Sequence, residues 1–347
     1  MRGAPHGVEV ARGEEPERRH EGKRIVEEAD AKFSCAGIET AEAKLIEFFT
    51  FAKDVGAIAM SAPTQSPRAR RRIVYDGPAM GNTSDFRGQW ALVTGASAGI
   101  GAALARELAG CGAKLILTAR RAERLEALAA ELTAKGTETR IVVADLNDSA
   151  GPRQIYDAIE KEGLAVDILV NNAGLGQYGA FFSSAAEQEL SQVRVNCEAV
   201  VRLSRLFVPG MVERRRGWLL VVASTASFQP VPYLTTYAAT KVFDRFFALG
   251  LAAEVARFGV KVTALCPGPT ESEFFEVAGA TVFKGRGIQA TPEGARLAIG
   301  ALARGKRTII PNFSGRFTAF LVRFLPVGLI THFVEKAARP KSGPTPQ

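Results

Sequence analysis

Histidine and cysteine are scarce in this chain. Its 347 residues include three histidines and four cysteines, with no C-x-x-C pair and no cluster at the spacing of metal ligands. A metal site and a disulfide scaffold are therefore not expected, because both need several such residues in a regular pattern. The scattered thiols indicate a reduced and therefore cytoplasmic setting. They are Cys35, Cys111, Cys197 and Cys266.

Long hydrophobic runs are also missing. Residues 45–59 form a short apolar stretch that includes charged side chains, and 317–334 is apolar but interrupted by Arg323, Pro326 and His332. A membrane-spanning helix needs about 20 predominantly apolar residues in a row, so neither stretch is expected to cross a bilayer. No cationic segment leads directly into an apolar core and a cleavage site, so no signal peptide is expected.

A glycine-rich turn follows the apolar run at 90–94, which is typical of a buried strand, and precedes the helical pattern at 102–109. Backbone N–H groups and the positive end of the helix dipole gather at such a turn and favour a phosphate. We predict that Gly95 makes the tight turn, Gly99 lets a ligand approach and Gly101 lets the helix pack on the strand. The spacing G-x-x-x-G-x-G departs from the general dinucleotide fingerprint, and an ordinary strand-to-helix turn is the alternative.

The second predicted strand, at 114–119, ends at Arg120 and Arg121 and carries no acid there. In dinucleotide-binding folds an acid at this place binds the ribose 2′-hydroxyl, whereas an arginine accommodates a 2′-phosphate. We therefore predict that Arg120 favours NADP(H) over NAD(H). The alternative is that both arginines merely begin a solvated helix over 121–135.

Two further strand ends supply candidate cofactor contacts. A strand at 140–144 runs into Asp145, whose carboxylate would accept from an adenine amino group or else cap a helix that begins near Ser149. A strand at 167–170 leads into a turn of small residues, which would let the backbone lie along the cofactor or would simply support the neighbouring strand. This turn contains Asn172, Ala173 and Gly174.

Ser224, Tyr237 and Lys241 form a candidate proton-transfer group. Ser224 follows the apolar run at 218–223, so it is expected at the carboxyl edge of the sheet, where open α/β folds bind ligands. Tyr237 and Lys241 are four residues apart within the segment 233–258 and therefore share one helical face. A tyrosine and a lysine at this spacing are common in helices, and only the upstream serine and glycine turn give the pair significance.

The chemistry requires a group that exchanges a proton near neutral pH. Free tyrosine titrates near ~10, which is too high for a good base. The ammonium of Lys241 and the positive nicotinamide ring would lower the pKa of Tyr237. Tyr237 would then act as acid/base, Lys241 would tune it and bind the nicotinamide ribose, and Ser224 would hydrogen-bond the substrate oxygen. The cofactor would supply the hydride.

In this order along the chain, the motifs resemble those of the short-chain dehydrogenase/reductase family, from Gln89 to about Pro311. The resemblance implies an α/β fold, namely a Rossmann-type, doubly wound parallel sheet of about seven strands with helices on both faces. It also implies an NADP(H)-preferring oxidoreductase that interconverts a carbonyl and an alcohol. In the family, an asparagine at the place of Asn196 holds a water that links the lysine to solvent. Family members are usually dimers or tetramers, so a homo-oligomer is expected.

The resemblance assigns two sets of site residues. The implied catalytic residues are Asn196, Ser224, Tyr237 and Lys241. The implied cofactor-binding residues are Gly95, Ser97, Gly99, Ile100, Gly101, Arg120, Asp145, Leu146, Asn172, Ala173, Gly174, Tyr237, Lys241, Pro267, Gly268 and Thr270. A non-catalytic, NADP-sensing protein with the same fold is the alternative from another class.

Phenylalanines near the predicted strand ends bear on the substrate. They indicate an apolar pocket for a lipid-like or aromatic carbonyl compound or alcohol, and ordinary core or dimer-interface rings are the alternative. In the segment after Thr270 they are Phe274, Phe275 and Phe283, and near other strand ends they are Phe181, Phe182 and Phe228.

The two ends of the chain differ from its centre. Residues 1–87 are rich in Arg, Glu, Ala and Pro and are predicted to be a disordered extension, or else not native, with a natural start near Met80. Residues 88–311 form the predicted catalytic domain. Residues 312–347 form a basic, apolar extension that is expected to be a lid or a subunit contact, with peripheral contact with a membrane surface as the alternative. Nucleic acid is not an expected partner, because no binding module accompanies the charge.

Overall fold

The computed structural model describes residues 83–270, 278–280 and 291–340. The expectations for 1–82, including a start near Met80, lie outside these residues. Phe274, Phe275 and Phe283 also lie outside them. The described chain begins with a short 3₁₀ helix, η1 (Thr83–Phe86), that leads into the first strand.

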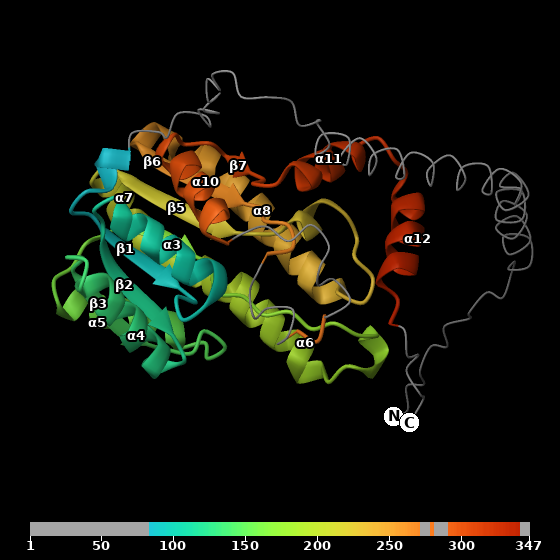
Figure 1. Ribbon diagram of the computed structural model, residues 1–347, viewed down its shortest axis with the longest axis horizontal. Helices are drawn as coiled ribbons and strands as arrows, with labels where there is room; N and C mark the ends of the chain where they lie inside the picture. Colours follow the sequence, from blue (N-terminus) through green and yellow to red (C-terminus); the bar gives the residue numbers. More distant parts are fainter. Residues whose placement is uncertain (1–82, 271–277, 281–290, 341–347) are drawn as a thin grey trace, which may run out of the picture. The chain divides into compact units, whose positions relative to one another are not determined.

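Seven parallel strands form one sheet in the order β3-β2-β1-β4-β5-β6-β7, within the part of the chain that is described (Figure 1). The predicted doubly wound sheet of about seven strands is therefore confirmed. The strand order reverses direction between β1 and β4, and ligands bind at the carboxyl ends of strands beside such a switch point. The strands are β1 (Trp90–Thr94), β2 (Lys114–Ala119), β3 (Thr139–Val143), β4 (Val166–Asn171), β5 (Gly217–Val222), β6 (Val260–Leu265) and β7 (Thr308–Ile309).

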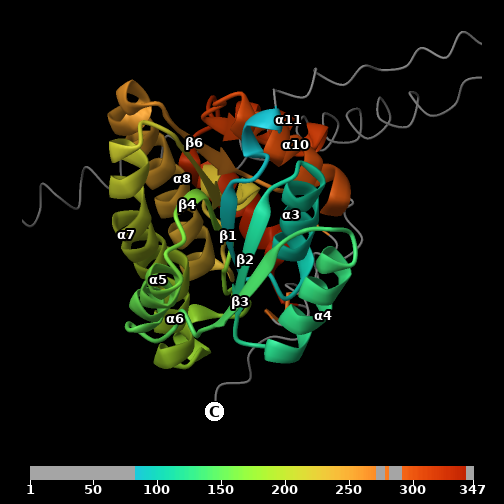
Figure 2. The same ribbon diagram turned by 90° about the vertical axis from the view of Figure 1, so that its left-hand side faces the viewer.

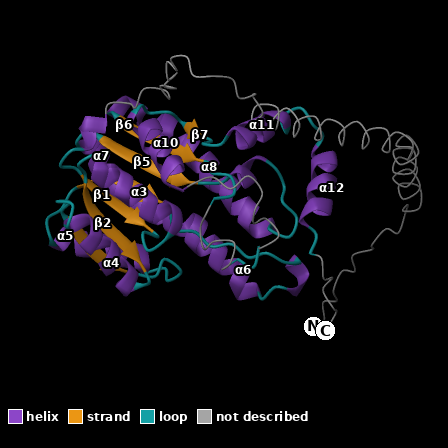
Figure 3. Ribbon diagram, viewed as in Figure 1, coloured by secondary structure: helices purple, strands orange, loops and turns teal. Residues whose placement is uncertain are grey.

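The central strands are buried along their whole length because helices cover both faces of the sheet. Every residue of β1, β4 and β5 is buried, which explains why these strands read as continuous apolar runs rather than alternating ones. Figure 3 shows the strands as a layer between helices. The principal helices are α3 (Gly99–Gly110), α4 (Ala122–Thr133), α5 (Gly151–Lys161), α6 (Ala186–Val193), α7 (Ala199–Glu213), α8 (Thr235–Val255) and α10 (Thr291–Ala303).

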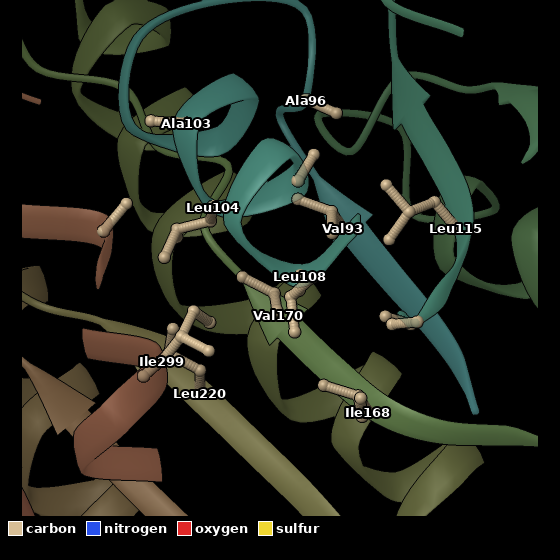
Figure 4. Close-up of a cluster of buried hydrophobic side chains, with 14 of the residues drawn as sticks. Val93, Ala96, Ala103, Leu104, Leu108, Leu115, Ile168, Val170, Leu220 and Ile299 are labelled. Atoms are coloured by element: carbon tan, nitrogen blue, oxygen red, sulfur yellow. The ribbon is translucent and has the colours of Figure 1, made fainter. Parts of the chain in front are cut away.

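Adjacent strand residues serve two separate cores, since side chains along a strand alternate between its faces. Val93 belongs to the cluster shared with α3, α4 and α10, whereas its neighbour Leu92 belongs to the cluster shared with α5, α7 and α8. Figure 2 shows these two groups of helices on opposite sides of the sheet. In the first cluster, Leu104 and Leu108 of α3 lie over the sheet near Val170 (Figure 4). The site is thus built on strand ends that two packed layers hold in place.

A single turn of π-helix interrupts the connection between α6 and α7. This turn, η3 (Arg194–Glu198), carries Asn196. π-helical turns inside α-helices occur frequently at functional sites, because the extra residue re-aims one side chain. Here the turn directs Asn196 into the interior, where none of its surface is exposed.

Two helices follow β7, namely α11 (Phe313–Leu321) and α12 (Val327–Ala338) (Figure 1). Two tyrosines, one in the loop after β4 and one in the loop before α8, hold α12 in place by hydrogen bonds. The hydroxyl of Tyr178 donates to the carbonyl of Ala338 over 2.7 Å, and that of Tyr233 donates to Glu335 over 2.7 Å. Across 83–270, 278–280 and 291–340, no helix has the length and apolar character needed to cross a membrane.

Candidate active site

One cavity of about 620 Å³ opens at the carboxyl ends of the strands. All of the predicted site residues line it except Asn196, which is fully buried behind it. Strand ends bring the residues together from positions that are far apart in the chain, as the sequence predicts. Those that line the cavity are Gly95, Ser97, Gly99, Ile100, Gly101, Arg120, Asp145, Leu146, Asn172, Ala173, Gly174, Ser224, Tyr237, Lys241, Pro267, Gly268 and Thr270.

The glycine turn has the backbone that a phosphate cradle requires. Gly95 and Gly99 have φ values of +64° and +53°, a left-handed conformation that side chains rarely adopt. A Cβ on Gly101 would lie 2.3 Å from the Gly95 carbonyl oxygen and 2.4 Å from Asn172 Nδ2. The first N–H groups of α3 have no partner within the helix, and Gly99, Ile100 and Gly101 face the cavity. The turn therefore offers free N–H donors to an anion in the cavity.

Asn172 supports this turn from the end of β4. Its Nδ2 atom donates to the carbonyl of Thr94 over 2.8 Å. The backbone N–H groups of Asn172 and Ala173 donate to the hydroxyl of Thr94 over 2.9 and 3.0 Å. The interpretation that these residues support a neighbouring strand is therefore confirmed for Asn172, and a cofactor contact there stays a prediction.

The end of β2 presents two arginines to the cavity. Arg120 Nη1 lies 4.0 Å from Asp145 Oδ2, and both side chains are largely exposed. Arg121 Nη2 donates to Ser97 Oγ over 3.2 Å. Arg121 is also the N-cap of α4, where the helix dipole disfavours a cation. The two guanidinium groups therefore concentrate positive potential on this wall.

Asp145 does not cap the next helix, so that alternative is wrong. Helix α5 begins at Gly151 after Ala150, with no side-chain cap. Instead, Asp145 Oδ1 accepts from the N–H of Asn147 over 2.9 Å and stabilises the turn after β3. Its other oxygen is left toward Arg120 and the cavity.

The candidate proton-transfer group lies between β5 and α8. Ser224 begins the turn after β5, and its Oγ accepts from the N–H of Ala226 over 3.1 Å. It is also hydrogen-bonded to Tyr237. Lys241 Nζ lies 5.9 Å from the centre of the Tyr237 ring. The three side chains are thus neighbours, as their spacing predicts.

The protonation of Tyr237 differs from the expectation. Burial raises the pKa of the phenol above its ordinary value, and Asp244 adds to this, while the Lys241 ammonium and the Ser224 hydrogen bond lower it by less. The net pKa is therefore above the ordinary tyrosine value rather than below it, and the lowering expected from a positive nicotinamide ring stays a prediction. The ammonium acts in the expected direction, but burial outweighs it. Tyr237 is a neutral phenol at physiological pH.

Asn196 clamps the loop after β4 to α8. Its Oδ1 accepts from the N–H of Leu175 over 2.8 Å, and its Nδ2 donates to the carbonyl of Leu175 and to Thr240 Oγ1, each over 2.9 Å. Both hydrogens of its Nδ2 are used in these bonds. The water-holding role that the family implies stays a prediction.

Two groups of residues at the site were not predicted from the sequence. One is Asp244, whose Oδ2 lies 2.9 Å from Lys241 Nζ, and the spacing of three residues was an available signal. The other comes from the C-terminal helices, which complete the cavity wall. Its members are Asn312, Ser314, Gly315, Thr318 and Val334.

The predicted phenylalanine lining is wrong where the structure tests it. Phe181 and Phe182 are 62% and 83% exposed and do not line the cavity. Phe228 lies elsewhere, with its ring 4.1 Å from the Arg245 guanidinium carbon. Smaller aliphatic side chains form the apolar part of the wall instead. They include Leu175, Val195, Val231, Leu234 and Val334.

The sequence matches the family described as short chain dehydrogenase over residues 89–281, and the chain belongs to that family. A very-long-chain 3-oxoacyl-CoA reductase from Anas platyrhynchos is 34% identical over 259 residues, which are 72% of this chain and 80% of that protein. The chain is accordingly an oxidoreductase that acts on a carbonyl/alcohol pair.

Solved structures share the fold. A short-chain dehydrogenase from Sphingobium yanoikuyae in complex with NADPH is 30% identical with a TM-score of 0.62, over 69% of this chain and 96% of that one. A 3-oxoacyl (acyl-carrier-protein) reductase from Agrobacterium tumefaciens with NADP bound is 26% identical with a TM-score of 0.61, over 69% and 98%.

The close approach at Gly101 yields a stability prediction. We expect Gly101→Ala to lower the free energy of unfolding by about 1–3 kcal/mol, because the new methyl group would meet the backbone of Gly95 and the Asn172 amide. A hydrogen bond to Thr94 holds that amide in place. Urea denaturation measures this. Gly110→Ala on the same helix is the matched control, since its methyl group meets nothing within 4 Å, and should leave stability unchanged or raise it by up to about 1 kcal/mol. Equal effects of both substitutions would contradict the tight packing.

Proposed function

We propose that the protein is an NADP(H)-dependent reductase of an apolar carbonyl compound, with Tyr237 as the proton donor. One observation carries this proposal: Ser224, Tyr237 and Lys241 line the same cavity as the glycine turn. Reduction of a carbonyl needs a hydride and a proton at one place, and the two halves of the cavity suit these two tasks.

The glycine turn fits a dinucleotide. The pyrophosphate would lie against the N–H groups of Gly99, Ile100 and Gly101, where the positive end of the α3 dipole favours an anion. The tight form of this turn requires glycine at Gly95 and Gly101, because a side chain at either place would collide with Asn172 and with neighbouring backbone. The NADPH and NADP that the two solved relatives hold support this assignment.

The arginines at the end of β2 favour a cofactor with an additional phosphate. No acid stands there to bind a ribose 2′-hydroxyl, and Arg120 and Arg121 both face the cavity. An anion between them would also offset the unfavourable placement of Arg121 at the start of α4. Arg120 would therefore hold the 2′-phosphate. Arg121, whose guanidinium is held by a hydrogen bond to Ser97, would add positive charge beside it.

The state of Tyr237 suits reduction. Because burial raises its pKa, the phenol carries its proton at neutral pH and gives it to the substrate oxygen as the carbonyl is reduced. NADPH would supply the hydride to the carbonyl carbon. Ser224 hydrogen-bonds Tyr237 and stands ready to donate to the same substrate oxygen, and Lys241 stabilises the phenolate that forms.

The substrate is an apolar carbonyl compound. The wall near Tyr237 includes Val231, Leu234 and Val334, which pack in one cluster with Tyr237 and offer few polar groups. Such a wall suits an alkyl chain. The name of the Anas platyrhynchos relative supports a long-chain 3-oxoacyl thioester as the substrate class.

Replacement of the phenol tests the chemistry. We expect Tyr237→Phe to lower kcat for NADPH-dependent reduction of a 3-oxoacyl thioester by roughly 10²–10⁴-fold, because the proton donor is lost. The affinity for NADPH, measured by fluorescence titration, should stay unchanged. Tyr156→Phe on α5, which does not line the cavity, is the control and should retain full activity. Full activity of Tyr237→Phe would refute Tyr237 as the donor, and absence of turnover by the native enzyme would favour the non-catalytic, NADP-sensing alternative.

Replacement of the arginine tests the cofactor preference. We expect Arg120→Ala to weaken NADPH binding by roughly ten- to a hundredfold, because a charge-assisted bond to phosphate is lost, and to leave NADH binding unchanged. Arg124→Ala on α4 removes an equal charge outside the cavity and should affect neither cofactor. An equal loss for NADPH and NADH would show that Arg120 does not read the 2′-phosphate.

The C-terminal helices have two dissimilar faces. Gly315 and Thr318 of α11 line the cavity, which favours the predicted lid. The outer side exposes apolar side chains between 59% and 76%, beside Arg316 and Arg323, which are exposed as well. Apolar and basic residues together suit the interface of an anionic membrane, so peripheral contact is our second proposal for this segment. The exposed apolar residues are Phe313, Phe320, Phe324 and Val327.

Vesicle binding tests the outer face. We expect the full chain to sediment with vesicles that contain phosphatidylserine and to detach as salt is raised, because cations and apolar rings act together. Phe320→Ser/Phe324→Ser should abolish co-sedimentation. Phe181→Ser/Phe182→Ser removes two rings elsewhere that are at least as exposed and should retain co-sedimentation. Equal behaviour of the two double variants would contradict a membrane-facing α11.

Other expectations from the sequence stay predictions. They are the cytoplasmic location, the boundaries at 87 and 311, and the homo-oligomer. For the last, the outer face of α8 offers Val242, Phe243 and Phe246, all partly exposed, as a surface for a second copy. Sedimentation velocity at several concentrations measures this association.

A further inference from the structure

Asp244 is a buried acid for which the proposed reaction has no use. It lies on α8 three residues after Lys241, with 1% of its side chain exposed, and it does not line the cavity. Its Oδ2 lies 2.9 Å from Lys241 Nζ, whereas its Oδ1 is buried without a hydrogen-bond partner. A carboxylate in such a place is costly unless a cation compensates it. Lys241 is the cation that does so.

The groups that face this ion pair are neutral. Burial raises the pKa of Cys197 on η3 to about 12 and that of Cys266 after β6 to about 11, so both thiols keep their protons. Tyr237 on α8 is a neutral phenol for the same reason. Burial raises the pKa of the Asp244 carboxyl as well, and the Lys241 ammonium opposes this. Among the residues that the structure describes, Asp244 is the carboxylate within ion-pair distance of Lys241.

Two opposing effects act on Lys241. Burial lowers the pKa of its ammonium, and the Asp244 carboxylate raises it, with the result that the pKa lies above the ordinary lysine value. Without the carboxylate, the largest effect that opposes burial would be gone, and burial would favour the neutral amine. Asp244 thus keeps Lys241 positive where solvent barely reaches it.

The ion pair also fixes where the ammonium points. Lys241 Nζ donates to the carbonyl of Val222 over 2.8 Å and to Asp244 Oδ2 over 2.9 Å. An ammonium has three hydrogens, so one remains for a group in the cavity that Lys241 lines. A lysine held by two acceptors at known positions has little freedom left for its third donor.

We propose that Asp244 is a positioning residue, which keeps Lys241 charged and holds it for cofactor binding. It acts entirely through Lys241, because it contacts neither the cavity nor solvent. The inference rests on the proposed function in one respect, namely that the cavity binds NADPH.

The decisive measurement is the titration of Lys241 itself, followed by NMR of ¹³C-labelled lysine in the protein without added nucleotide. Asp244→Asn preserves the size of the side chain and removes its charge. We expect it to lower the pKa of Lys241 by about three units, which is the size of shift that burial produces when no counter-charge opposes it. Asp157→Asn, which removes an exposed acid on α5, is the control and should leave that pKa in place. An unchanged Lys241 pKa in Asp244→Asn would overturn the proposal.

A second readout is the affinity for NADPH as a function of pH, measured by fluorescence. In the native protein it should be level from pH 7 to 9, because Lys241 stays charged. In Asp244→Asn it should weaken by about tenfold over that range, as the lysine loses its proton. A loss of equal size at every pH would point to a merely structural role and would contradict the proposal. If Asp244→Asn shows the expected change in the Lys241 pKa but the native protein binds no NADPH, the proposed function is refuted and the charge assignment stands.

A double substitution decides the case in which Asp244→Asn fails to fold. If Asp244 acts only through Lys241, then Lys241→Met/Asp244→Leu removes both charges together and should fold, because no buried charge is left uncompensated. Folding of the double variant and failure of Asp244→Asn would support the proposal. Failure of both, with Lys241→Met folded, would show that Asp244 serves the fold directly and would overturn it.

Discussion

One buried hydroxyl joins the two strand ends between which the site opens. Thr94, at the end of β1, donates to the carbonyl of Val170 over 3.1 Å and accepts from the N–H groups of Asn172 and Ala173. A threonine hydroxyl has one hydrogen and two lone pairs, so this one is fully used. It fixes the distance between the turn after β1 and the turn after β4. The glycine turn follows Thr94 directly, and the loop that Asn196 holds follows Ala173, so the hydrogen bonds of Thr94 fix where both segments begin.

The sequence predicts those parts of the site that depend on local patterns. Buried parallel strands are continuous apolar runs, and their carboxyl ends meet at one edge of the sheet. The sequence therefore predicts that Ser224 and Gly95 are neighbours, although about 130 residues separate them in the chain. The spacing of Tyr237 and Lys241 places both on one face of α8 in the same way. The left-handed φ of Gly95 is likewise a property that glycine alone makes inexpensive.

Other parts of the site depend on the combined effect of residues that are distant in the sequence, and a local sequence pattern does not contain this information. The pKa of Tyr237 results from burial by several elements set against one nearby ammonium, so its direction could not be read from the spacing of two residues. The phenylalanines at 181 and 182 lie near a strand end in the sequence, but their 3₁₀ turn leaves them facing outward. Val334 lines the cavity from α12, a helix that hydrogen bonds from the distant residues Tyr178 and Tyr233 help to hold in place.

Helices α11 and α12 complete the cavity wall, so the cavity depends on residues near the C-terminal end of the described chain. The region that defines the family ends at residue 281, yet α10 packs on α3, and part of the cavity wall comes from α11 and α12. A fragment trimmed to the shared region would therefore keep the glycine turn and Tyr237. It would lose the side of the cavity formed by α11 and α12, and it would also lose α10, which packs on α3. The shape of the cavity is then a property of the described chain as a whole and not of the shared region alone.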